Sequence, residues 1–210
     1  VWRTYAQAGL EEMAANSKVP VINSLSDDFH PCQLLADLMT VREHKGSLAG
    51  LKIAYIGDAS NNMANSYLIA CAMAGMHVAV AGPAGYSANE AVVERASQIA
   101  AQTGGSVRVY QSPSDAIAGA DVVTTDTWVS MGQEDQKAQR VTDFGDYQVD
   151  AQLMAQADSS AIFLHCLPAY RGYEVAAEVL DGPQSRIWDE AENRLHVQKA
   201  LMEYLLCGKL

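Results

Sequence analysis

The sequence is poor in cysteine and in basic residues, and both shortages narrow what the protein can be. Four cysteines, Cys32, Cys71, Cys166 and Cys207, are spread over 210 residues without a C-x-x-C pair. A disulfide framework is therefore not expected, and a reducing, cytoplasmic setting is. Lys and Arg number 14 against 25 Asp and Glu, a net charge of −11. This balance argues against nucleic-acid partners, which need a basic face. A small anionic substrate stays compatible with it, because a few local cations can outweigh a distant negative surface.

The chain also lacks a convincing membrane segment. Residues 67–86 carry no Asp, Glu, Lys or Arg, which is long enough for a span. His77 and the Gly82-Pro83 break favour a buried helix followed by a buried strand, so we expect no membrane partner. Residue 1 is Val and already lies in a strand-like segment. We therefore expect the natural start to lie further upstream, where a mitochondrial targeting segment would stand in a eukaryotic protein.

Strand and helix signals alternate along most of the chain. Strand-like runs at 52–57, 77–81, 107–110, 121–126 and 161–165 are separated by helical patterns at 63–75, 88–103 and 114–119, with another at 150–157. The helix that ends at 103 stops at Gly104-Gly105, a helix terminator, and Ser112 or Ser114 would cap the short one. The alternation predicts the α/β class, with a doubly wound parallel sheet.

The two ends of the chain follow another pattern. Strands are expected at 1–4 and 19–23 around a helix near 10–15, followed by a long helix over 30–44 opened by Asp27 or Asp28 and Pro31. A last amphipathic helix is expected over 191–206. We interpret residues 1–34 as the C-terminal remnant of a first α/β domain and 35–188 as the second domain. Residues 189–210 would form a helix that returns toward the first.

Two polar loops follow strand-like runs, and they contain the carboxylate, hydroxyl, imidazole and thiol groups best suited to binding or catalysis. They are Asp126-Thr-Trp-Val-Ser-Met-Gly-Gln133 and Phe163-Leu-His-Cys-Leu-Pro168. In an open α/β sheet, ligands gather at the carboxyl ends of strands, so Asp126 and Cys166 should face one crevice. The Asp126 carboxylate could pair with a substrate ammonium and the Ser130 hydroxyl could hold a carboxylate. The alternative for this loop is a polar Asx-type turn.

The His165-Cys166 pair permits several interpretations. A thiol beside an imidazole can have a lowered pKa and take part in proton transfer. Cys166 could equally be a buried filler and His165 a satisfied core residue. Zinc binding with His30 and Cys32 is disfavoured, because adjacent residues on a strand point to opposite faces and the spacing fits no usual zinc pattern. We expect no metal site.

The turn Gly57-Asp-Ala-Ser-Asn-Asn62 also joins a strand to a helix. It lacks G-x-G-x-x-G, which disfavours a dinucleotide cofactor and a nicotinamide oxidoreductase. An asparagine here could bind an amino-acid head group, or Asn61 and Asn62 could simply cap the helix.

Three further segments offer anion-binding groups. His30-Pro-Cys-Gln33 opens a helix whose free N–H groups favour an anion, with His30 and Gln33 as added donors, or else it is a plain cap. Arg3 ends a strand and could bind a phosphate or carbonyl oxygen, or be a surface arginine. Arg194 could reach the same site or pair with Glu190 at i,i+4.

Taken together, these stretches resemble the ornithine carbamoyltransferases of the aspartate/ornithine carbamoyltransferase family over essentially the whole chain. The specific motifs are Asp126-x-Trp-x-Ser-Met-Gly132 and His165-Cys-Leu-Pro168, supported by His30-Pro-Cys-Gln33, the Gly57–Asn62 turn and Glu190-Ala-Glu-Asn-Arg194. The aspartate enzymes share the fold and His-Pro-x-Gln but lack the Ser-Met-Gly loop.

The resemblance implies a role for each motif residue and no cofactor. Carbamoyl phosphate would be bound by Arg3, His30, Gln33, Cys166, Leu167 and Arg194. Ornithine would be bound by Asn62, Asp126, Ser130 and Met131. Cys166, His30 and Arg194 would be the catalytic residues.

One family element is not in this sequence. The Ser-x-Arg-Thr-Arg phosphate motif belongs to a carbamoyl-phosphate domain that builds much of the family's trimer interface. We therefore expect the chain alone to be incomplete for catalysis and the full-length protein to be a homo-oligomer. A non-catalytic amino-acid-binding module and a carbamoyltransferase for putrescine or acetylornithine remain as alternatives.

Overall fold

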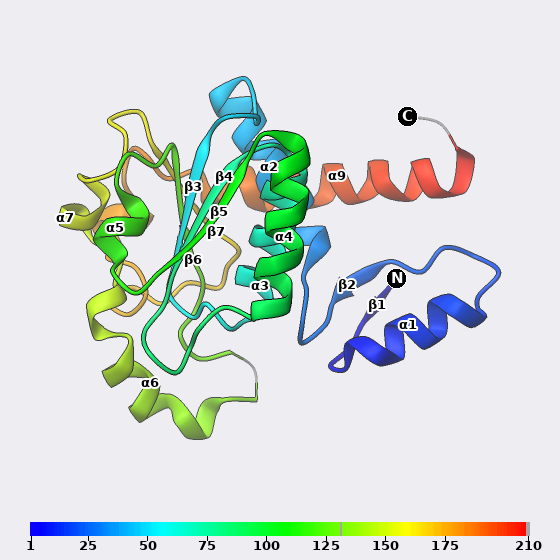
Figure 1. The fold of residues 1–210 in the computed structure, drawn as a ribbon, viewed down its shortest axis with the longest axis horizontal. Helices are drawn as coiled ribbons and strands as arrows, with labels where there is room; N and C mark the ends of the chain where they lie inside the picture. The colour runs from blue at the N-terminus through cyan, green and yellow to red at the C-terminus, as the bar shows by residue number, and fades with distance from the viewer. Residues whose placement is uncertain (131, 209–210) are drawn as a thin grey trace.

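The computed structural model describes residues 1–130 and 132–208. Figure 1 shows an α/β body with a smaller N-terminal unit beside it. The elements are β1 (Trp2–Arg3), α1 (Gln7–Asn16), β2 (Asn23–Leu25), α2 (Pro31–Lys45), β3 (Lys52–Ile56), α3 (Asn62–Met73), β4 (His77–Ala81), α4 (Glu90–Thr103), β5 (Ser106–Tyr110), α5 (Pro113–Ile117), β6 (Val122–Thr125), η1 (Glu134–Gln136), α6 (Lys137–Asp143), η2 (Gly145–Tyr147), α7 (Ala151–Met154), β7 (Ile162–His165), α8 (Ala177–Leu180) and α9 (Ile187–Cys207).

The body is a five-stranded sheet in the order β5-β4-β3-β6-β7, and every pairing is parallel. The chain builds outward from β3 through β4 to β5, then crosses back to place β6 on the other side of β3. Neighbouring β3 and β6 are therefore the switch point, where the loops that follow the two strands diverge and leave a crevice. The predicted doubly wound α/β sheet is confirmed.

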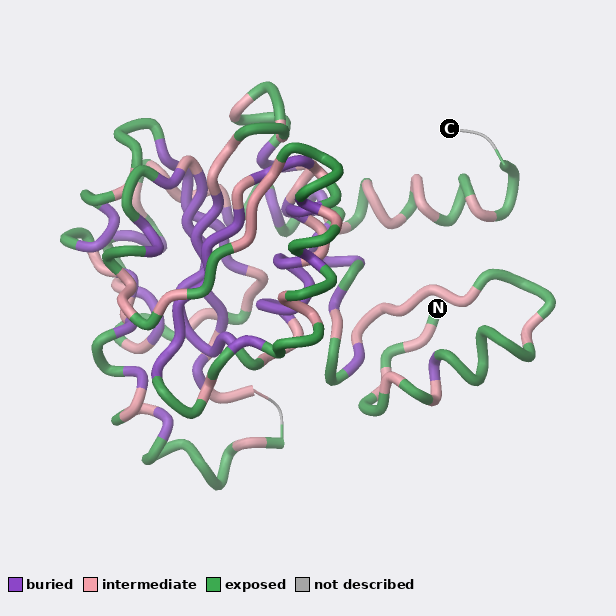
Figure 2. Tube along the Cα trace, in the orientation of Figure 1, coloured by how far each residue is buried: buried purple, intermediate pink, exposed green. Residues whose placement is uncertain are grey.

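The sheet is covered on both faces, which explains the continuous apolar character of its strands. One face packs against α3, α4 and part of α2, with Tyr55, Leu68 and Leu164 among its buried side chains. The other packs against α5, α7, α8 and the segment around Phe144. Figure 2 shows the buried strands at the centre, with largely exposed helical surfaces outside them. No helix within the described ranges is long and apolar enough to cross a membrane.

The N-terminal unit is a small β1–α1–β2 arrangement with parallel pairing of β1 and β2. Side chains of α3 attach it to the body. Asn62 Nδ2 donates to the Ser26 carbonyl at 2.8 Å, and the His30 N–H donates to Ser66 Oγ at 2.7 Å. Helix α2 then lies against α9, and α9 extends toward the side of the N-terminal unit in Figure 1.

Several predicted boundaries were wrong. The strand expected at 19–23 is β2 at Asn23–Leu25, because Pro20 has no N–H for a ladder and pairing begins where Trp2 N donates to the Ile22 carbonyl. The helix expected at 150–157 covers only Ala151–Met154, and the last helix starts earlier, at Ile187. Ser112 caps α5, and Gly104 ends α4 with a φ of 87°, both as predicted.

Candidate active site

A cleft of about 860 Å³ opens at the carboxyl ends of β3, β6 and β7. This is the switch point of the sheet, so the strand order itself places the cleft. The residues predicted for the site that line it are Arg3, His30, Asn62, Asp126, Ser130, Cys166, Leu167 and Arg194. Met131 lies outside the described residues.

Asp126 and Cys166 meet inside this cleft. The Cys166 thiol donates to Asp126 Oδ1 at 3.2 Å. The same carboxylate accepts from the Thr127 N–H at 2.7 Å and from Asn61 Nδ2 at 3.2 Å. The predicted convergence of the two loops is therefore present, and it gives the cleft a buried carboxyl group surrounded by donors.

The pKa of the Cys166 thiol does not follow the first interpretation of the His165-Cys166 pair, which was a lowered value. Burial, followed by the negative charge of Asp126, raises it well above the usual value. Cys166 is thus a neutral S–H donor, and His165 does not activate it, because the imidazole lies on the other side of the strand end. Burial also raises the pKa of Asp126, which makes that carboxyl group a better proton acceptor than an exposed one.

The opposite wall of the cleft is cationic. Arg3 comes from β1, His30 precedes α2 and Arg194 comes from α9. Burial and the charges of Arg194 and Arg3 together lower the pKa of His30 to about 4, so the imidazole is neutral at pH 7. The ring bonds to the backbone of Ser24, while Nδ1 is buried without a partner in the described part of the chain. Two guanidinium groups therefore gather where an anion could bind, and the unprotonated Nδ1 of the neutral imidazole beside them can accept a hydrogen bond.

The prediction that Gln33 adds a donor for this anion was wrong for the arrangement observed. Its Nε2 donates to Asp37 and Glu190, and its Oε1 accepts from Arg194 Nη1. The pocket walls formed by the described residues do not include Gln33. The buried carboxyl groups draw the amide inward because an unsatisfied buried acceptor costs more than a lost surface contact. The i,i+4 alternative for Arg194 is likewise replaced by this contact with Gln33.

Asn61 and Asn62 divide the two roles considered for them. Asn61 caps α3 by accepting from the Ala64 N–H, and its Nδ2 bridges Tyr55 Oη at 2.9 Å and Asp126. Asn62 lines the cleft but donates to the Ser26 carbonyl. Asn61 is thus the direct support of Asp126, which the sequence did not distinguish from its neighbour.

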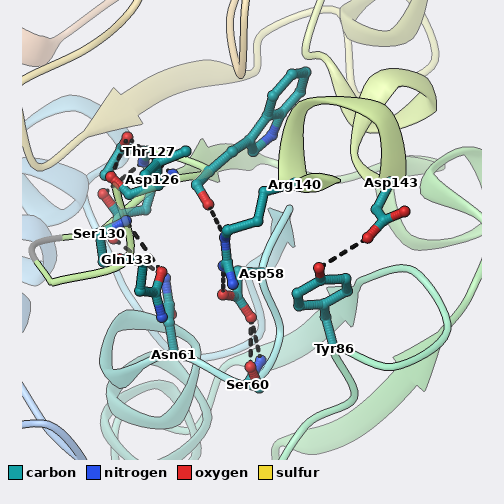
Figure 3. Close-up of polar contacts among 12 residues, drawn as sticks. Asp58, Ser60, Asn61, Tyr86, Asp126, Thr127, Ser130, Gln133, Arg140 and Asp143 are labelled. Atoms are coloured by element: carbon teal, nitrogen blue, oxygen red, sulfur yellow. Dashed lines mark hydrogen bonds and ion pairs between the residues drawn. The ribbon is translucent and has the colours of Figure 1, made fainter. Parts of the chain in front are cut away.

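A buried ion pair fixes the base of the loop that follows Asp126. Arg140 of α6 contacts Asp58 and donates to the Trp128 carbonyl, and Asp58 in turn accepts from Ser60. Figure 3 shows Arg140 over Asp58, beside the group formed by Asn61, Asp126, Ser130 and Gln133. The guanidinium also lies 4.9 Å from the Tyr86 ring centroid. This contact ties the turn after β3 to the loop after β6.

The turn after β7 has its own support. Leu167 has a φ of 55°, a sparsely populated region for a residue with a side chain. Its N–H donates to His165 Nδ1 at 2.9 Å, and His165 Nε2 lies 3.3 Å from Glu174 Oε1. His165 therefore acts as a buried spacer that aims Cys166 and Leu167 into the cleft.

Four buried charged residues that contact the supports of the cleft were not among the predicted site residues: Asp37, Asp58, Arg140 and Glu190. All four are at least 97 % buried. Asp37 and Glu190 stand at helical positions whose neighbours are core residues, and a charged residue in such a position was the available signal. The partner of Asp58 lies 82 residues away, a separation that local patterns do not reveal.

The sequence matches two protein-family models, and together they cover most of the chain. Residues 49–205 match the model described as "Aspartate/ornithine carbamoyltransferase, Asp/Orn binding domain", and residues 1–43 match that of the carbamoyl-P binding domain. The chain belongs to this carbamoyltransferase family. The resemblance stated from the motifs is thereby confirmed.

Individual relatives agree with the family assignment. The ornithine carbamoyltransferase of Clavibacter michiganensis subsp. michiganensis is 66% identical over 98% of this chain and 67% of its own length. That of Renibacterium salmoninarum is 66% identical over 98% and 66%. The solved ornithine carbamoyltransferase from Pyrococcus furiosus has a TM-score of 0.94 and 46% identity, covering 99% of this chain and 66% of that one. The chain thus spans about two thirds of the length of the relatives it matches.

We predict that Arg140 and Asp58 are strongly coupled in stability. Arg140→Met should lower the free energy of unfolding by about 3–5 kcal/mol, because it leaves a buried carboxylate unpaired. Adding Asp58→Asn should cost less than the sum of the single changes. Urea unfolding of the four proteins in the cycle measures this, and Arg171→Met, in the exposed pair with Asp181, serves as the control with little effect. Additive costs would show that the pair does not act as a unit.

We also predict an acid dependence of stability from His30. Its folded pKa of about 4 lies below the unfolded value of 6.5, so between these values the unfolded chain binds the extra proton. The free energy of unfolding should therefore fall as the pH drops from 6.5 to 4, by up to about 3 kcal/mol from this group. Urea unfolding at several pH values should show a shallower decline for His30→Gln than for the parent. Parallel curves would contradict the prediction.

Proposed function

We propose that the full-length protein transfers the carbamoyl group of carbamoyl phosphate to the δ-amine of L-ornithine, giving L-citrulline and phosphate. The observation that carries this proposal is the polarity of the cleft. A buried carboxyl group, Asp126, stands on one wall, and Arg3, His30 and Arg194 stand on the other. A diamino acid and an acyl phosphate need these two environments side by side. The relatives that are 66% identical carry the name ornithine carbamoyltransferase.

The reaction asks three things of such a cleft. The amine must be neutral when its nitrogen attacks the carbamoyl carbon, so the proton it loses needs an acceptor. The oxygen that becomes negative in the tetrahedral intermediate needs donors, and the phosphate that leaves with the C–O bonding electrons needs positive charge. Arg194 and Arg3 would meet the last two needs, and the neutral His30 would bind carbamoyl phosphate beside them.

Asp126 would bind an ammonium group of ornithine, and Cys166 would keep that carboxylate oriented. The raised pKa of the thiol supports a donor role for Cys166 and leaves Asp126 as the acceptor of the pair. Ser130, Met131 and Asn62 would complete the ornithine side, and Leu167 would lie over the reacting carbon. Gln33 would act through Arg194, whose Nη1 donates to its amide oxygen.

We propose a matching division of the chain. Residues 1–34 would belong to the carbamoyl-phosphate domain, 35–188 to the ornithine domain and 189–210 to a helix that packs on the first domain. Exposed apolar side chains on α9, among them Leu195 and Leu206 at 67% and 79% exposure, support a covered position for this helix in the full-length protein. The family resemblance further suggests a cytoplasmic homo-oligomer, a trimer or a multiple of it, acting in arginine biosynthesis.

The substrate assignment predicts a preference among amines. With carbamoyl phosphate and the full-length protein, kcat/KM for ornithine should exceed that for putrescine or acetylornithine by about 100-fold or more, because each analogue leaves a buried polar group unpaired. Product formation by each amine, alone and in competition, measures this. A preference for another amine would refute the substrate. Ornithine binding without citrulline would favour the non-catalytic module.

Cys166 gives a second prediction. Cys166→Ala removes one donor to the Asp126 carboxylate and should lower kcat/KM for ornithine by about 10- to 100-fold, the value of a hydrogen bond to a charged group. The melting temperature should change little, because the thiol lies at a strand end. Cys166→Ser should recover part of the loss, and Cys207→Ala, far along α9, should behave like the parent. Unchanged kinetics in Cys166→Ala would exclude the role.

A further inference from the structure

Two acidic side chains lie together beneath the cationic wall of the cleft. Asp37 comes from α2 and Glu190 from α9, and their residues are 1% and 0% exposed. The Gln33 amide nitrogen bridges them, at 2.8 Å to Asp37 Oδ1 and 3.1 Å to Glu190 Oε1. The two carboxyl groups are themselves within hydrogen-bond reach of each other. Two adjacent carboxylates cannot both be ionised in such a place.

Donors complete the surroundings of the pair. The Tyr67 hydroxyl of α3 donates to Asp37 Oδ2 at 2.6 Å, and the His165 N–H at the end of β7 donates to Glu190 Oε2 at 2.8 Å. The other titratable groups facing the pair are Cys71 of α3, Arg194 of α9 and Cys166 after β7. Each of the four carboxyl oxygens therefore accepts a hydrogen bond from a neutral donor.

The pKa directions agree with one shared proton. Burial raises the pKa of both groups, and the charge of Asp37 adds to the larger rise at Glu190. The two groups together therefore hold one proton. One negative charge remains, and it stands across the Gln33 amide from the positive charge of Arg194.

This arrangement leaves Gln33 a single orientation. Both N–H bonds of its amide are used by acceptors, so its oxygen must face away, toward Arg194 Nη1. The amide dipole is thereby aligned between a carboxylate and a guanidinium. Glu190 also holds the backbone of His165, which precedes Cys166 and Leu167. The two acidic residues thus contact Gln33 and His165, which support two walls of the cleft, and do not line the cleft themselves.

We propose that Asp37 and Glu190 share one proton and act as positioning residues, holding Arg194 through Gln33 and the turn after β7 through His165. The inference rests on the proposed function for its kinetic consequence. Loss of the proton at high pH would leave both carboxyl groups negatively charged beside the Gln33 amide. Their mutual repulsion would separate them and loosen the support of Arg194. The KM for carbamoyl phosphate should therefore rise on the alkaline side.

Two variants of Glu190 in the full-length protein separate this role from mere packing. Glu190→Gln reproduces the carboxylic acid, since its amide can donate to Asp37, and should keep the KM for carbamoyl phosphate within about fivefold of the parent, the equivalent of one neutral hydrogen bond. It should also abolish the alkaline rise. Glu190→Ala should lower kcat/KM by roughly 100-fold at every pH, as misplacement of binding groups does. If Glu190→Gln is as damaging as Glu190→Ala, or keeps the alkaline rise, the shared proton is excluded.

Infrared spectroscopy tests the proton without reference to activity. At neutral pH, the parent should show the C=O stretch of a protonated carboxylic acid, and Glu190→Gln should lack it. Asp181→Asn, at an exposed ion pair whose acid has a lowered pKa, should leave the band in place. Absence of the band from the parent would overturn the inference. Its presence in a protein that forms no citrulline would refute the proposed function and leave the pair intact.

Discussion

Parallel pairing of β3 with β6 is the constraint on which the rest of the site depends. It makes the two strands neighbours although α3, β4, α4, β5 and α5 separate them in the chain. Their following loops must turn away from each other, and the opening between them cannot be filled by a direct connection. Two contacts cross this opening and join the two loops. Asn61 donates to Asp126, and Arg140 pairs with Asp58.

The chemistry of the cleft is set by burial more than by the identity of neighbouring residues. His30 is neutral because burial, and then two guanidinium groups, oppose its charge. Cys166 stays a thiol because burial, and then the negative charge of Asp126, oppose its ionisation. Proton donors and acceptors are thus sorted by their surroundings, a pattern common where proton transfer accompanies bond formation.

Much of the fold and part of the site could be predicted from the sequence. Strand and helix periods identified the parallel sheet, and the polar residues after β6 and β7 identified Asp126 and Cys166, because both signals are local. The boundary at β2 and the hydrogen-bond partners of Gln33 could not be predicted. Both depend on partners distant in the chain, Trp2 in one case and Glu190 in the other. The lowered thiol pKa considered for Cys166 did not hold for the same reason, because burial and the charge of Asp126, which follows another strand, raise it.

Helix α9 begins beside the sheet and continues for 21 residues, a length of about 32 Å. Its first turns supply Glu190 and Arg194, while its far end extends toward the side of the N-terminal unit (Figure 1). Because α9 is one continuous helix, a movement of its last turns is transmitted to its first turns. Its distal turns end about 20 Å beyond Arg194, so contacts made far outside the cleft bear on the position of a guanidinium inside it.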